Sequence, residues 1–495
     1  MRTLFTLLLA AASLPAAVKL PALISDHMVL QQGKPARIWG TADPAESVQV
    51  ALQGQTIAVK ADEKGKWTAW LRPLIAGGPL DLTVNNLTVH DVLVGEVWLG
   101  SGQSNMEFRL QTAVNHDEEI AHANYPLIRL FQVKHAIAEQ PMDDVVGTWQ
   151  LCSPAAVKSF SAVEYFFGRH LQQDLHVPMG LIESDWGGTP AQSWISRPAL
   201  ETDASMKYVT DDWDQTLARY PAAKQRFDQQ MEQWNTLSAQ AKSDSKPAPP
   251  RPNPPAGPGH QNTPASLYNG MIAPLTPYAI RGFIWYQGES NANELHAYRY
   301  RHLFANMIED WRSQWGEGEI PFLYVQLANF QTNGWWPLLR ESQTDTLRLR
   351  NTGMALAIDI GESKDIHPKN KQDVGLRLAL AARAIAYHEP VEYSGPMFET
   401  AAPEGNAMRA YFTHADGMRA TGADALKGFE VAGADGKFVA ADAKVEGNTV
   451  LVSSAQIEAP VAVRYAWADD PVCNLVNLAG LPAIPFRSGE RINAK

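Results

Sequence analysis

Apolar residues in the first part of the chain come in short runs of strand length, separated by turn residues at close intervals. Residues 48–52, 67–71 and 80–84 are three of these runs, and pairs such as Asp43-Pro44 and Gly77-Gly78 separate neighbouring runs. Many short strands at this spacing are typical of a sandwich of antiparallel sheets. The pattern therefore predicts a small N-terminal β-sandwich over residues 18–94.

From about residue 95, apolar runs of strand length alternate with longer helical segments. The expected strands cover residues 97–99, 177–182, 282–286, 322–327 and 354–359, and the expected helices cover residues 163–175, 294–315 and 373–387. This alternation predicts an α/β fold, with a parallel sheet flanked by helices, over residues 95–390. Ligands of such sheets bind beyond the carboxyl ends of the strands, so the turns after the strands are the candidate functional segments.

An insertion interrupts this domain at about residues 203–264. Apolar residues from Trp213 to Leu237 recur every three to four positions and predict an amphipathic helix, which either packs on the core or lies beside the active site. Residues 247–264 contain eight prolines, which favour an extended return. Short strands resume after the α/β domain and predict a C-terminal β domain over residues 391–495.

The N-terminus has the parts of an export signal. Arg2 precedes an apolar core at residues 4–12, and small residues at 14–17 form a cleavage site. We expect a signal peptide over residues 1–17 and a periplasmic or secreted protein, the alternative being an N-terminal core strand. No later segment offers about 20 apolar residues without charge or proline, so we expect no membrane-spanning helix.

Charge and cysteine content narrow the function classes. The 42 basic and 53 acidic residues give a net charge of −11, which disfavours nucleic acid and anionic lipid as partners. Cys152 and Cys473 lack the clustered spacing of a zinc site. They form either one distant disulfide or two separate thiols.

Two of the turns after strands carry residues suited to acyl transfer. Ser104 lies in Gly102-Gln103-Ser104-Asn105-Met106, where a neighbouring base could take the serine proton. Gly187 and Gly188 follow the next strand, and backbone N–H groups in such a turn can approach a developing oxyanion. Each motif alone also fits an ordinary structural turn.

Two further turns supply amide, carboxylate and imidazole groups. Gln287 and Asn291 could donate hydrogen bonds to an oxyanion, and Glu289 between them could accept from a histidine. Asp365 precedes His367 by two residues and could fix its tautomer and stabilise the imidazolium.

These four turns, in this order, resemble those of the SGNH hydrolase superfamily and, within it, the sialate O-acetylesterase-like carbohydrate esterases. The motifs that carry the resemblance are Gly102-Gln103-Ser104-Asn105-Met106, Trp186-Gly187-Gly188-Thr189, Trp285-Tyr286-Gln287-Gly288-Glu289 and Asp365-Ile366-His367-Pro368. The likeness extends to both β-rich flanks. It departs from the superfamily in the last block, usually D-x-x-H, and in the third, usually G-x-N-D.

The resemblance implies a serine esterase that removes O-acetyl groups from sugars without a metal or organic cofactor. Ser104 would be the nucleophile and His367 the base, with Asp365, or alternatively Glu289, as the acid. The implied oxyanion hole consists of the N–H of Ser104, the N–H of Gly187 or Gly188, and the side chain of Gln287, with Asn291 as the alternative.

Substrate identity is less defined by the sequence. Trp186, Trp285, Tyr286 and Trp335 are the candidate platforms for a sugar ring, and Arg340 or Arg109 could bind the carboxylate of a sialic acid. We expect an acetylated carbohydrate, either plant polysaccharide such as hemicellulose or xyloglucan oligosaccharides, or O-acetylated sialic acid. The alternatives are a catalytically inactive carbohydrate-binding surface protein and a short-chain lipase or thioesterase of the same superfamily.

Overall fold

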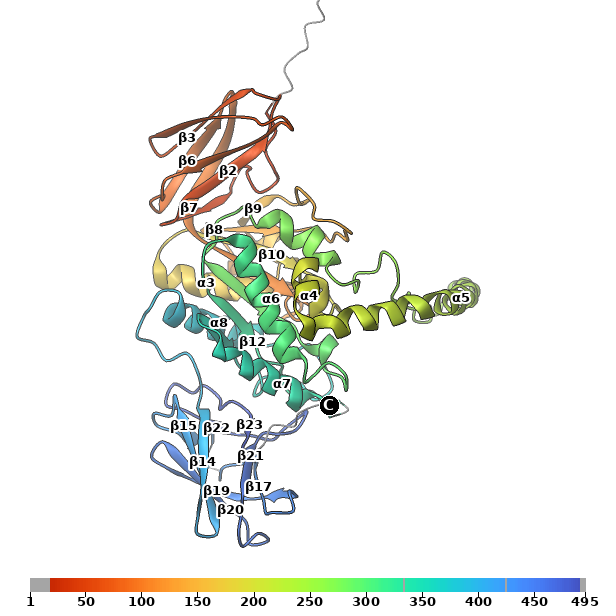
Figure 1. The fold of residues 1–495 in the computed structure, drawn as a ribbon, viewed down its shortest axis with the longest axis vertical. Coiled ribbons are helices and arrows are strands. Elements are labelled where there is room, and N and C mark those ends of the chain that lie inside the picture. The colour runs from red at the N-terminus through yellow and green to blue at the C-terminus, as the bar shows by residue number, and fades with distance from the viewer. Residues whose placement is uncertain (1–17, 333, 423–424, 490–495) are drawn as a thin grey trace, which may run out of the picture.

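The computed structural model describes residues 18–332, 334–422 and 425–489. Three parts follow one another along its long axis: an N-terminal β part, a central α/β part and a C-terminal β part (Figure 1). One long helix, α5, projects sideways from the centre. The expected signal peptide at residues 1–17 lies outside the described residues.

The N-terminal part is built from short strands, as the spacing of turn residues predicts, and its strand pairs are antiparallel except for one parallel pair formed by the first strand. Its strands are β1 (Val29–Gln31), β2 (Ala36–Thr41), β3 (Ser47–Leu52), β4 (Gln55–Lys60), β5 (Lys66–Leu71) and β6 (Gly77–Val84). Strand β7 (Leu87–Gly102) then runs without a break into the central part. It pairs with β1 and β6 at its start and with β10 and β11 at its end. The change of pattern near residue 95 therefore falls inside one continuous strand.

The central sheet has the order β13-β12-β11-β7-β10-β8-β9. The strands not yet given are β8 (Tyr125–Gln132), β9 (Trp149–Cys152), β10 (Met179–Asp185), β11 (Gly282–Tyr286), β12 (Phe322–Val325) and β13 (Thr352–Ala355). All neighbours run parallel except β8 and β9, which are antiparallel. The expectation of a purely parallel sheet is wrong at this edge, so the sheet is mixed.

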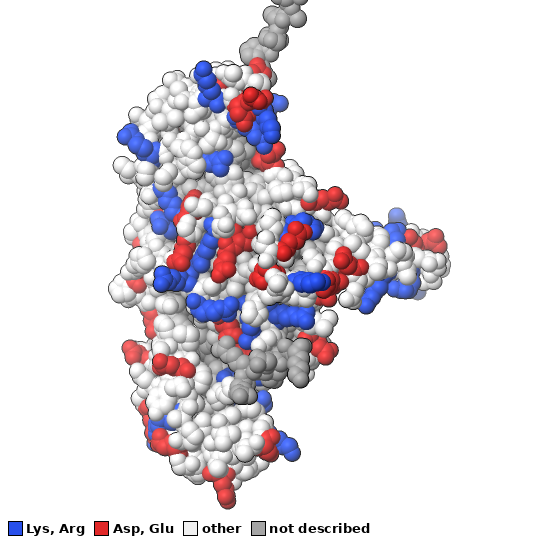
Figure 2. Space-filling model, in the orientation of Figure 1, with Lys and Arg blue, Asp and Glu red and all other residues white. Residues whose placement is uncertain are grey.

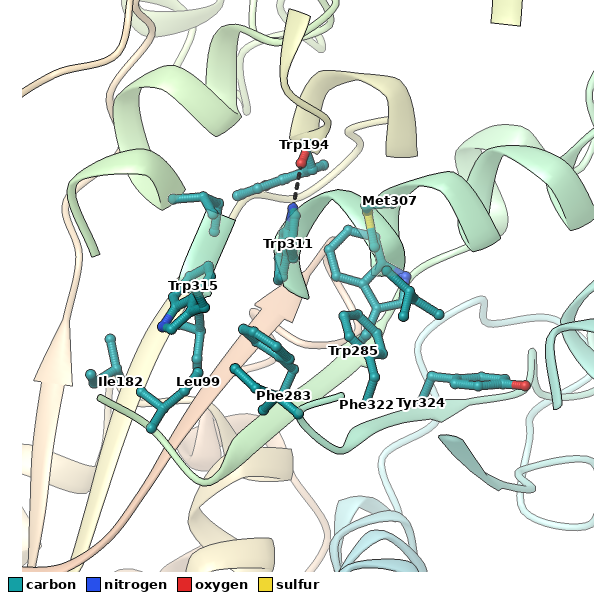
Figure 3. Packing of buried hydrophobic residues seen from close by; sticks show 14 of the residues in the cluster. Leu99, Ile182, Trp194, Phe283, Trp285, Met307, Trp311, Trp315, Phe322 and Tyr324 are labelled. Carbon is teal, nitrogen blue, oxygen red and sulfur yellow. Dashed lines mark hydrogen bonds between the residues drawn. The ribbon is translucent and has the colours of Figure 1, made fainter. Parts of the chain in front are cut away.

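Helices cover both faces of the central sheet. The helices of this part are α1 (His116–His122), α2 (Pro154–Val157), α3 (Ala162–Leu175), α4 (Arg197–Thr202), α6 (Tyr300–Trp315), α7 (Trp336–Asp345) and α8 (Lys371–Ile385). Because side chains alternate along a strand, Ile284 and Tyr286 of β11 face α3 and α8, whereas Phe283 and Trp285 face α6. Figure 3 shows the aromatic side of this core, with Trp285 packed beside Trp311.

The insertion forms the single helix α5 (Lys207–Ser243), which contains Pro221. Of its residues only Val209 is buried, so the apolar stripe does not pack on the central core. The proline-rich segment that follows lies against α5. The indole of Trp234 donates to the carbonyl of Pro249 at 2.8 Å, and the guanidinium of Arg251 lies over the Trp234 ring.

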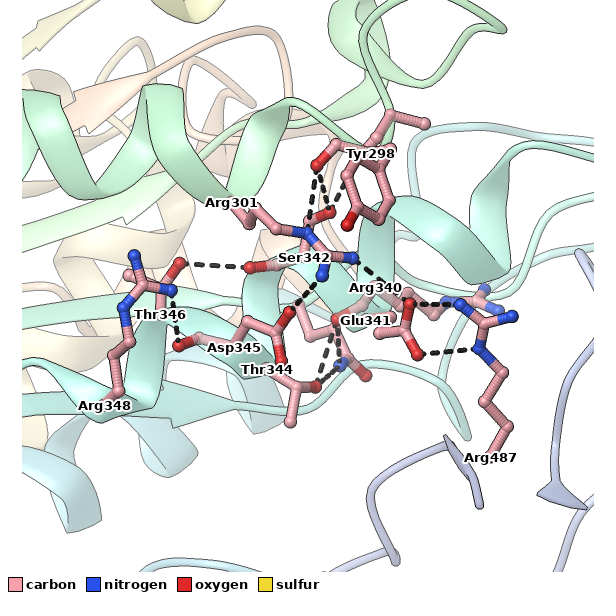
Figure 4. A network of polar contacts seen from close by, with 12 residues as sticks. Tyr298, Arg301, Arg340, Glu341, Ser342, Thr344, Asp345, Thr346, Arg348 and Arg487 are labelled. Atoms are coloured by element: carbon pink, nitrogen blue, oxygen red, sulfur yellow. Dashed lines mark hydrogen bonds and ion pairs between the residues drawn. The ribbon is translucent and has the colours of Figure 1, made fainter. Parts of the chain in front are cut away.

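The C-terminal part is again built from short strands. These are β14 (Met397–Glu404), β15 (Ala407–Thr413), β16 (Arg419–Ala420), β17 (Phe429–Ala432), β18 (Phe438–Ala440), β19 (Asp442–Glu446), β20 (Thr449–Ser453), β21 (Ala462–Tyr465), β22 (Leu475–Val476) and β23 (Phe486–Arg487). Figure 4 shows how it joins the centre: Glu341 of α7 accepts from Arg487 of β23 and from Arg301 of α6.

The cysteines, the surface charges and the lengths of the helices complete the description of the fold. Cys152 and Cys473 are both free thiols, so the disulfide alternative is wrong. On the face shown in Figure 2, acidic and basic side chains intermingle over the central part. No helix among the described residues is long and apolar enough to cross a membrane.

Candidate active site

The turns after β7, β10 and β11 meet at one edge of the central sheet. The strand register pairs Gly102 with both Asp185 and Tyr286, the last residues of β10 and β11. Gly102 has φ +144°, and a Cβ atom there would lie 2.2 Å from the carbonyl oxygen of Tyr286. Only glycine fits this position, which turns the chain out of the sheet two residues before Ser104.

The hydroxyl of Ser104 meets the imidazole of His367 at this edge. Ser104 Oγ lies 2.8 Å from His367 Nε2, within hydrogen-bond distance, although 263 residues separate them in sequence. Both side chains are partly exposed, so a substrate can reach them. The structure thus brings together the predicted nucleophile and base.

Asp365 lies beside the other ring nitrogen of this histidine. Its Oδ1 is 3.6 Å from His367 Nδ1 and accepts a 2.9 Å hydrogen bond from the backbone N–H of His367. The pKa of His367 is lowered by burial and by the charge of Lys371, against the opposing effect of Asp365. The imidazole is therefore neutral near pH 7 and able to accept a proton.

Glu289, the alternative acid, does not reach the histidine. Its Oε1 accepts a 2.6 Å hydrogen bond from Asn105 Nδ2, and burial raises its pKa. The geometry therefore places Asp365, and not Glu289, next to His367.

Two of the predicted oxyanion donors are already engaged by side chains. The N–H of Gly187 donates to Glu107 Oε2 at 2.5 Å. The amide of Gln287 donates to Asn291 Oδ1 at 2.7 Å and accepts from the hydroxyl of Tyr300 at 2.8 Å. Gln287 is fully buried, so the expectation that its amide faces the oxyanion is wrong in this arrangement.

The alternative donor Asn291 is also occupied. Its Nδ2 donates to Gln192 Oε1 at 3.0 Å, and its Oδ1 accepts from Gln287 and from the N–H of Ala191. In contrast, the N–H groups of Ser104 and Gly188 have no protein acceptor among the described residues. These two groups are the donors that remain available to a substrate oxygen.

Burial corrects three of the expected substrate contacts. Trp285 and Tyr286 are fully buried, since both faces of the sheet are covered by helices. Arg340 is also fully buried and donates to the carbonyls of Leu327 and Ala328 and, in the C-terminal part, to those of residues 468 and 469. It joins the central and C-terminal parts and does not face a substrate.

Trp186 and Trp335 remain partly exposed and available to a ligand. The ring of Trp186 stacks on His135, with ring centroids 4.0 Å apart and planes at 8°. Arg109, the other candidate for a sugar carboxylate, already pairs with Glu107 and Glu183.

One group of side chains near Ser104 has donors that a metal ion could use. Ligand atoms of Glu107, His135 and Asp185 lie within 4.8 Å of one another. However, Arg109 pairs with Glu107 Oε1 at 3.0 Å, and the N–H of Gly187 occupies Oε2. These contacts already satisfy the Glu107 carboxylate, so a cation would have to displace them.

Two residues beside the catalytic pair, Asn105 and Lys371, were not predicted from the sequence. Asn105 Oδ1 accepts a 2.5 Å hydrogen bond from Nζ of Lys371, the first residue of α8. Asn105 lies inside the Gly102–Met106 motif, and this position next to Ser104 was a sequence signal for a role in the site. Nothing local marks Lys371, because its partner is 266 residues away.

The sequence and the structure of the chain were compared with those of known proteins. A family model described as carbohydrate esterase, sialic acid-specific acetylesterase matches residues 259–386. Sialate O-acetylesterase of Mus musculus is 31% identical, covering 94% of this chain and 93% of that protein, and the Homo sapiens protein is 31% identical over 94% and 91%. A carbohydrate acetylesterase of Xanthomonas citri has a solved structure with 38% identity and a TM-score of 0.82, covering 96% of this chain and 100% of that one.

The fold and these relatives define a carboxylic ester hydrolase. More narrowly, the chain belongs to the sialate O-acetylesterase family of carbohydrate esterases. This confirms the resemblance found in the sequence motifs.

Proposed function

We propose that the protein removes O-acetyl groups from carbohydrates through an acetyl-serine intermediate on Ser104. The observation that carries the proposal is the 2.8 Å contact between Ser104 Oγ and His367 Nε2 at the carboxyl edge of the sheet. A serine paired with a neutral histidine is the arrangement that acyl transfer requires. Family membership favours this esterase over an inactive carbohydrate-binding protein.

The first half of the reaction acylates the serine. His367 Nε2 takes the hydroxyl proton as Ser104 Oγ attacks the acetyl carbonyl carbon. The N–H groups of Ser104 and Gly188 would donate to the resulting oxyanion. The bond between the carbonyl carbon and the sugar oxygen then breaks, and the imidazolium returns its proton to that oxygen.

The second half releases acetate. A water molecule gives a proton to His367 and attacks the acetyl carbon, and Ser104 Oγ leaves with the proton that His367 returns. Each step uses groups of the chain itself. The fold that supports this chemistry is, in our proposal, the SGNH type with flanking β domains, and residues 1–17 act as an export signal.

Asp365 is expected to be the histidine's partner in this mechanism. Asp365→Asn should lower kcat by about 10²-fold or more, because an amide does not stabilise the imidazolium. Glu289→Gln should cost at most about 10-fold, since Glu289 contacts Asn105 and not the imidazole. Steady-state rates on p-nitrophenyl acetate compare the two, and a larger loss in Glu289→Gln would reverse the assignment.

The site favours a neutral sugar as substrate. Both arginines considered for a sialic acid carboxylate are engaged, Arg340 by backbone carbonyls and Arg109 by two glutamates. We therefore place neutral acetylated plant polysaccharides and their oligosaccharides first and O-acetylated sialic acid second. Acetate release from acetylated xylan, xyloglucan, pectin and sialic acid tests this order, and release from the sialic acid alone would contradict it.

A cleft between α5 and the active-site turns could hold the sugar chain. It has a volume of about 230 Å³ and is lined by Pro190, Gln192, Trp213, Asn262 and Ser290, among others. Its wall is continuous with the catalytic turn, because the N–H of Ser290 donates to the side chain of Gln103.

Trp213→Ala is expected to raise KM for an acetylated oligosaccharide by about 10-fold, because stacking on an aromatic face contributes about 1 kcal/mol or more. Cleavage of p-nitrophenyl acetate, which needs only the catalytic centre, should not change. Trp70→Ala, on the distant N-terminal sandwich, is the matched control. An equal loss on both esters in a folded Trp213 variant would show that this residue shapes the catalytic centre itself.

A further inference from the structure

A fully buried lysine lies directly behind the nucleophile. Lys371 has no exposed surface, and its Nζ donates to Asn105 Oδ1 at 2.5 Å. The same ammonium group lies 4.7 Å from the ring centroid of Phe108 and 5.1 Å from that of Tyr286. A lysine is almost never buried to this degree unless a specific partner requires it.

Asn105, which receives this hydrogen bond, joins four segments of the chain. Its Nδ2 donates to Glu289 Oε1 at 2.6 Å, in the turn after β11, and to the carbonyl of Ile366 at 3.0 Å. Asn105 follows Ser104, and Ile366 precedes His367. One amide therefore ties the turn of the nucleophile to the loop of the base.

The orientation of this amide is fixed by its neighbours. An ammonium group only donates, so the oxygen of Asn105 must face Lys371, and its NH₂ group must face the carboxylate and the carbonyl. Reversing the amide would place NH₂ against ammonium and oxygen against two acceptors. Both ends of the side chain are therefore held by charged groups.

Lys371, which is buried, and Glu289, which is partly buried, lie on either side of the Asn105 amide. Burial lowers the pKa of Lys371 to about 7, against the favourable charges of Glu289, Asp365 and Glu362. Burial raises the pKa of Glu289, while Asn105 and Lys371 act in the opposite direction. The charged groups that face His367 are Lys371 and Asp365, and the lysine lowers the histidine pKa.

We propose that Lys371 is a positioning residue for the proposed esterase reaction: through Asn105 it holds Ser104 and His367 at hydrogen-bond distance. The inference rests on the proposed function, since it needs Ser104 and His367 to be the reacting pair. No other cation among the described residues contacts Asn105.

Two measurable effects follow from this arrangement. Loss of the ammonium group frees Asn105, and a misplacement of about 1 Å between nucleophile and base costs about 100-fold in rate. Loss of the positive charge also raises the pKa of His367, so protonated histidine persists to higher pH.

The test is Lys371→Met, which keeps length and apolar bulk but removes the charge and the donor. We expect kcat on p-nitrophenyl acetate to fall about 10- to 100-fold with little change in KM. The acidic limb of the kcat/KM profile should move to higher pH. Lys369→Met, an exposed lysine two residues earlier, removes the same net charge and should leave both quantities unchanged.

Double-mutant analysis separates this role from a general effect on folding. If Lys371 acts through Asn105, Asn105→Ala combined with Lys371→Met should lower kcat no further than the more damaging single change. Independent, multiplying losses would overturn the proposed route through Asn105. A folded Lys371→Met variant with wild-type kcat and an unmoved acidic limb would overturn the inference as a whole.

Asn105→Ala alone covers the case in which Lys371→Met does not fold. It removes the amide through which Lys371 acts, so kcat should fall by a similar factor, and a folded Asn105→Ala variant with wild-type kcat would overturn the inference. Ser104→Ala, measured in parallel, tells the two claims apart. If that variant stays active, the proposed mechanism fails, whereas an inactive Ser104→Ala beside an unaffected Lys371→Met refutes only the positioning role.

Discussion

Ser104→Ala is expected to lower kcat on p-nitrophenyl acetate by about 10⁴-fold or more, because no other group can form the acyl intermediate. Among the described residues the hydroxyl makes one hydrogen bond, with His367 Nε2, so its removal should change the melting temperature by no more than about 1–2 °C. Activity and thermal unfolding, measured on the same preparation, check both statements. His367→Ala should cause a comparable loss, since nucleophile and base act as one unit.

Ser290→Ala is a suitable control for this experiment. Ser290 lies near the nucleophile, but its contact with Gln103 uses the backbone N–H, so the substitution leaves that hydrogen bond in place. It should retain most of the activity on p-nitrophenyl acetate, which does not need the cleft that Ser290 lines. Residual activity of Ser104→Ala within about tenfold of wild type, in a protein that melts normally, would exclude the serine mechanism.

Among the substitutions proposed here, Arg340→Met is expected to cause the largest loss of stability. The guanidinium makes four hydrogen bonds of 2.7–2.9 Å to the carbonyls of residues 327, 328, 468 and 469. Among the described residues, the carbonyls of Leu327 and Ala468 have no other donor, whereas those of Ala328 and Asp469 keep Trp336 Nε1 and the N–H of Phe330. Each carbonyl left unpaired costs about 1–3 kcal/mol, so the variant should lose about 2–4 kcal/mol in the free energy of unfolding. The pKa of Arg340, lowered to about 10 by burial, keeps the group charged at neutral pH.

The measurement for Arg340→Met is thermal unfolding, with limited proteolysis at the boundary between the central and C-terminal parts. Arg350→Met is the control, because Arg350 is exposed and a hydrogen bond involves only its backbone carbonyl. We expect a fall of about 5–10 °C for Arg340→Met and little change for the control. Unchanged stability together with weaker binding of acetylated sialic acid would restore the original interpretation of Arg340 as a substrate contact.

The sequence was sufficient for the parts of the site that lie at strand ends. Ser104 and His367 each follow a strand of one alternating domain, and parallel strands end at the same edge of the sheet, so their proximity could be inferred without coordinates. The antiparallel edge was missed because β8 begins with Tyr125-Pro126 and β9 has only four residues, which leaves little periodic signal.

The site predictions that the structure corrects depend on the direction in which a side chain points. Trp285 and Tyr286 stand next to the recognised Gln287-Gly288-Glu289 motif, yet a strand covered by helices on both faces buries every side chain along its length. Gln287 and Asn291 both carry suitable amides, but they satisfy each other. The link between Asn105 and Lys371 joins distant positions in the sequence, and only the fold shows that they meet.

The most direct test of the central claim is covalent labelling by a serine-directed organophosphate such as diethyl p-nitrophenyl phosphate. We expect one phosphoryl group per chain, located on Ser104 by peptide mass spectrometry, with loss of activity in proportion to labelling. The Ser104→Ala variant should take up none, and His367→Ala should be labelled much more slowly because the hydroxyl lacks its base. Stoichiometric inactivation with the label on another residue, or full activity in a chain labelled at Ser104, would contradict the account.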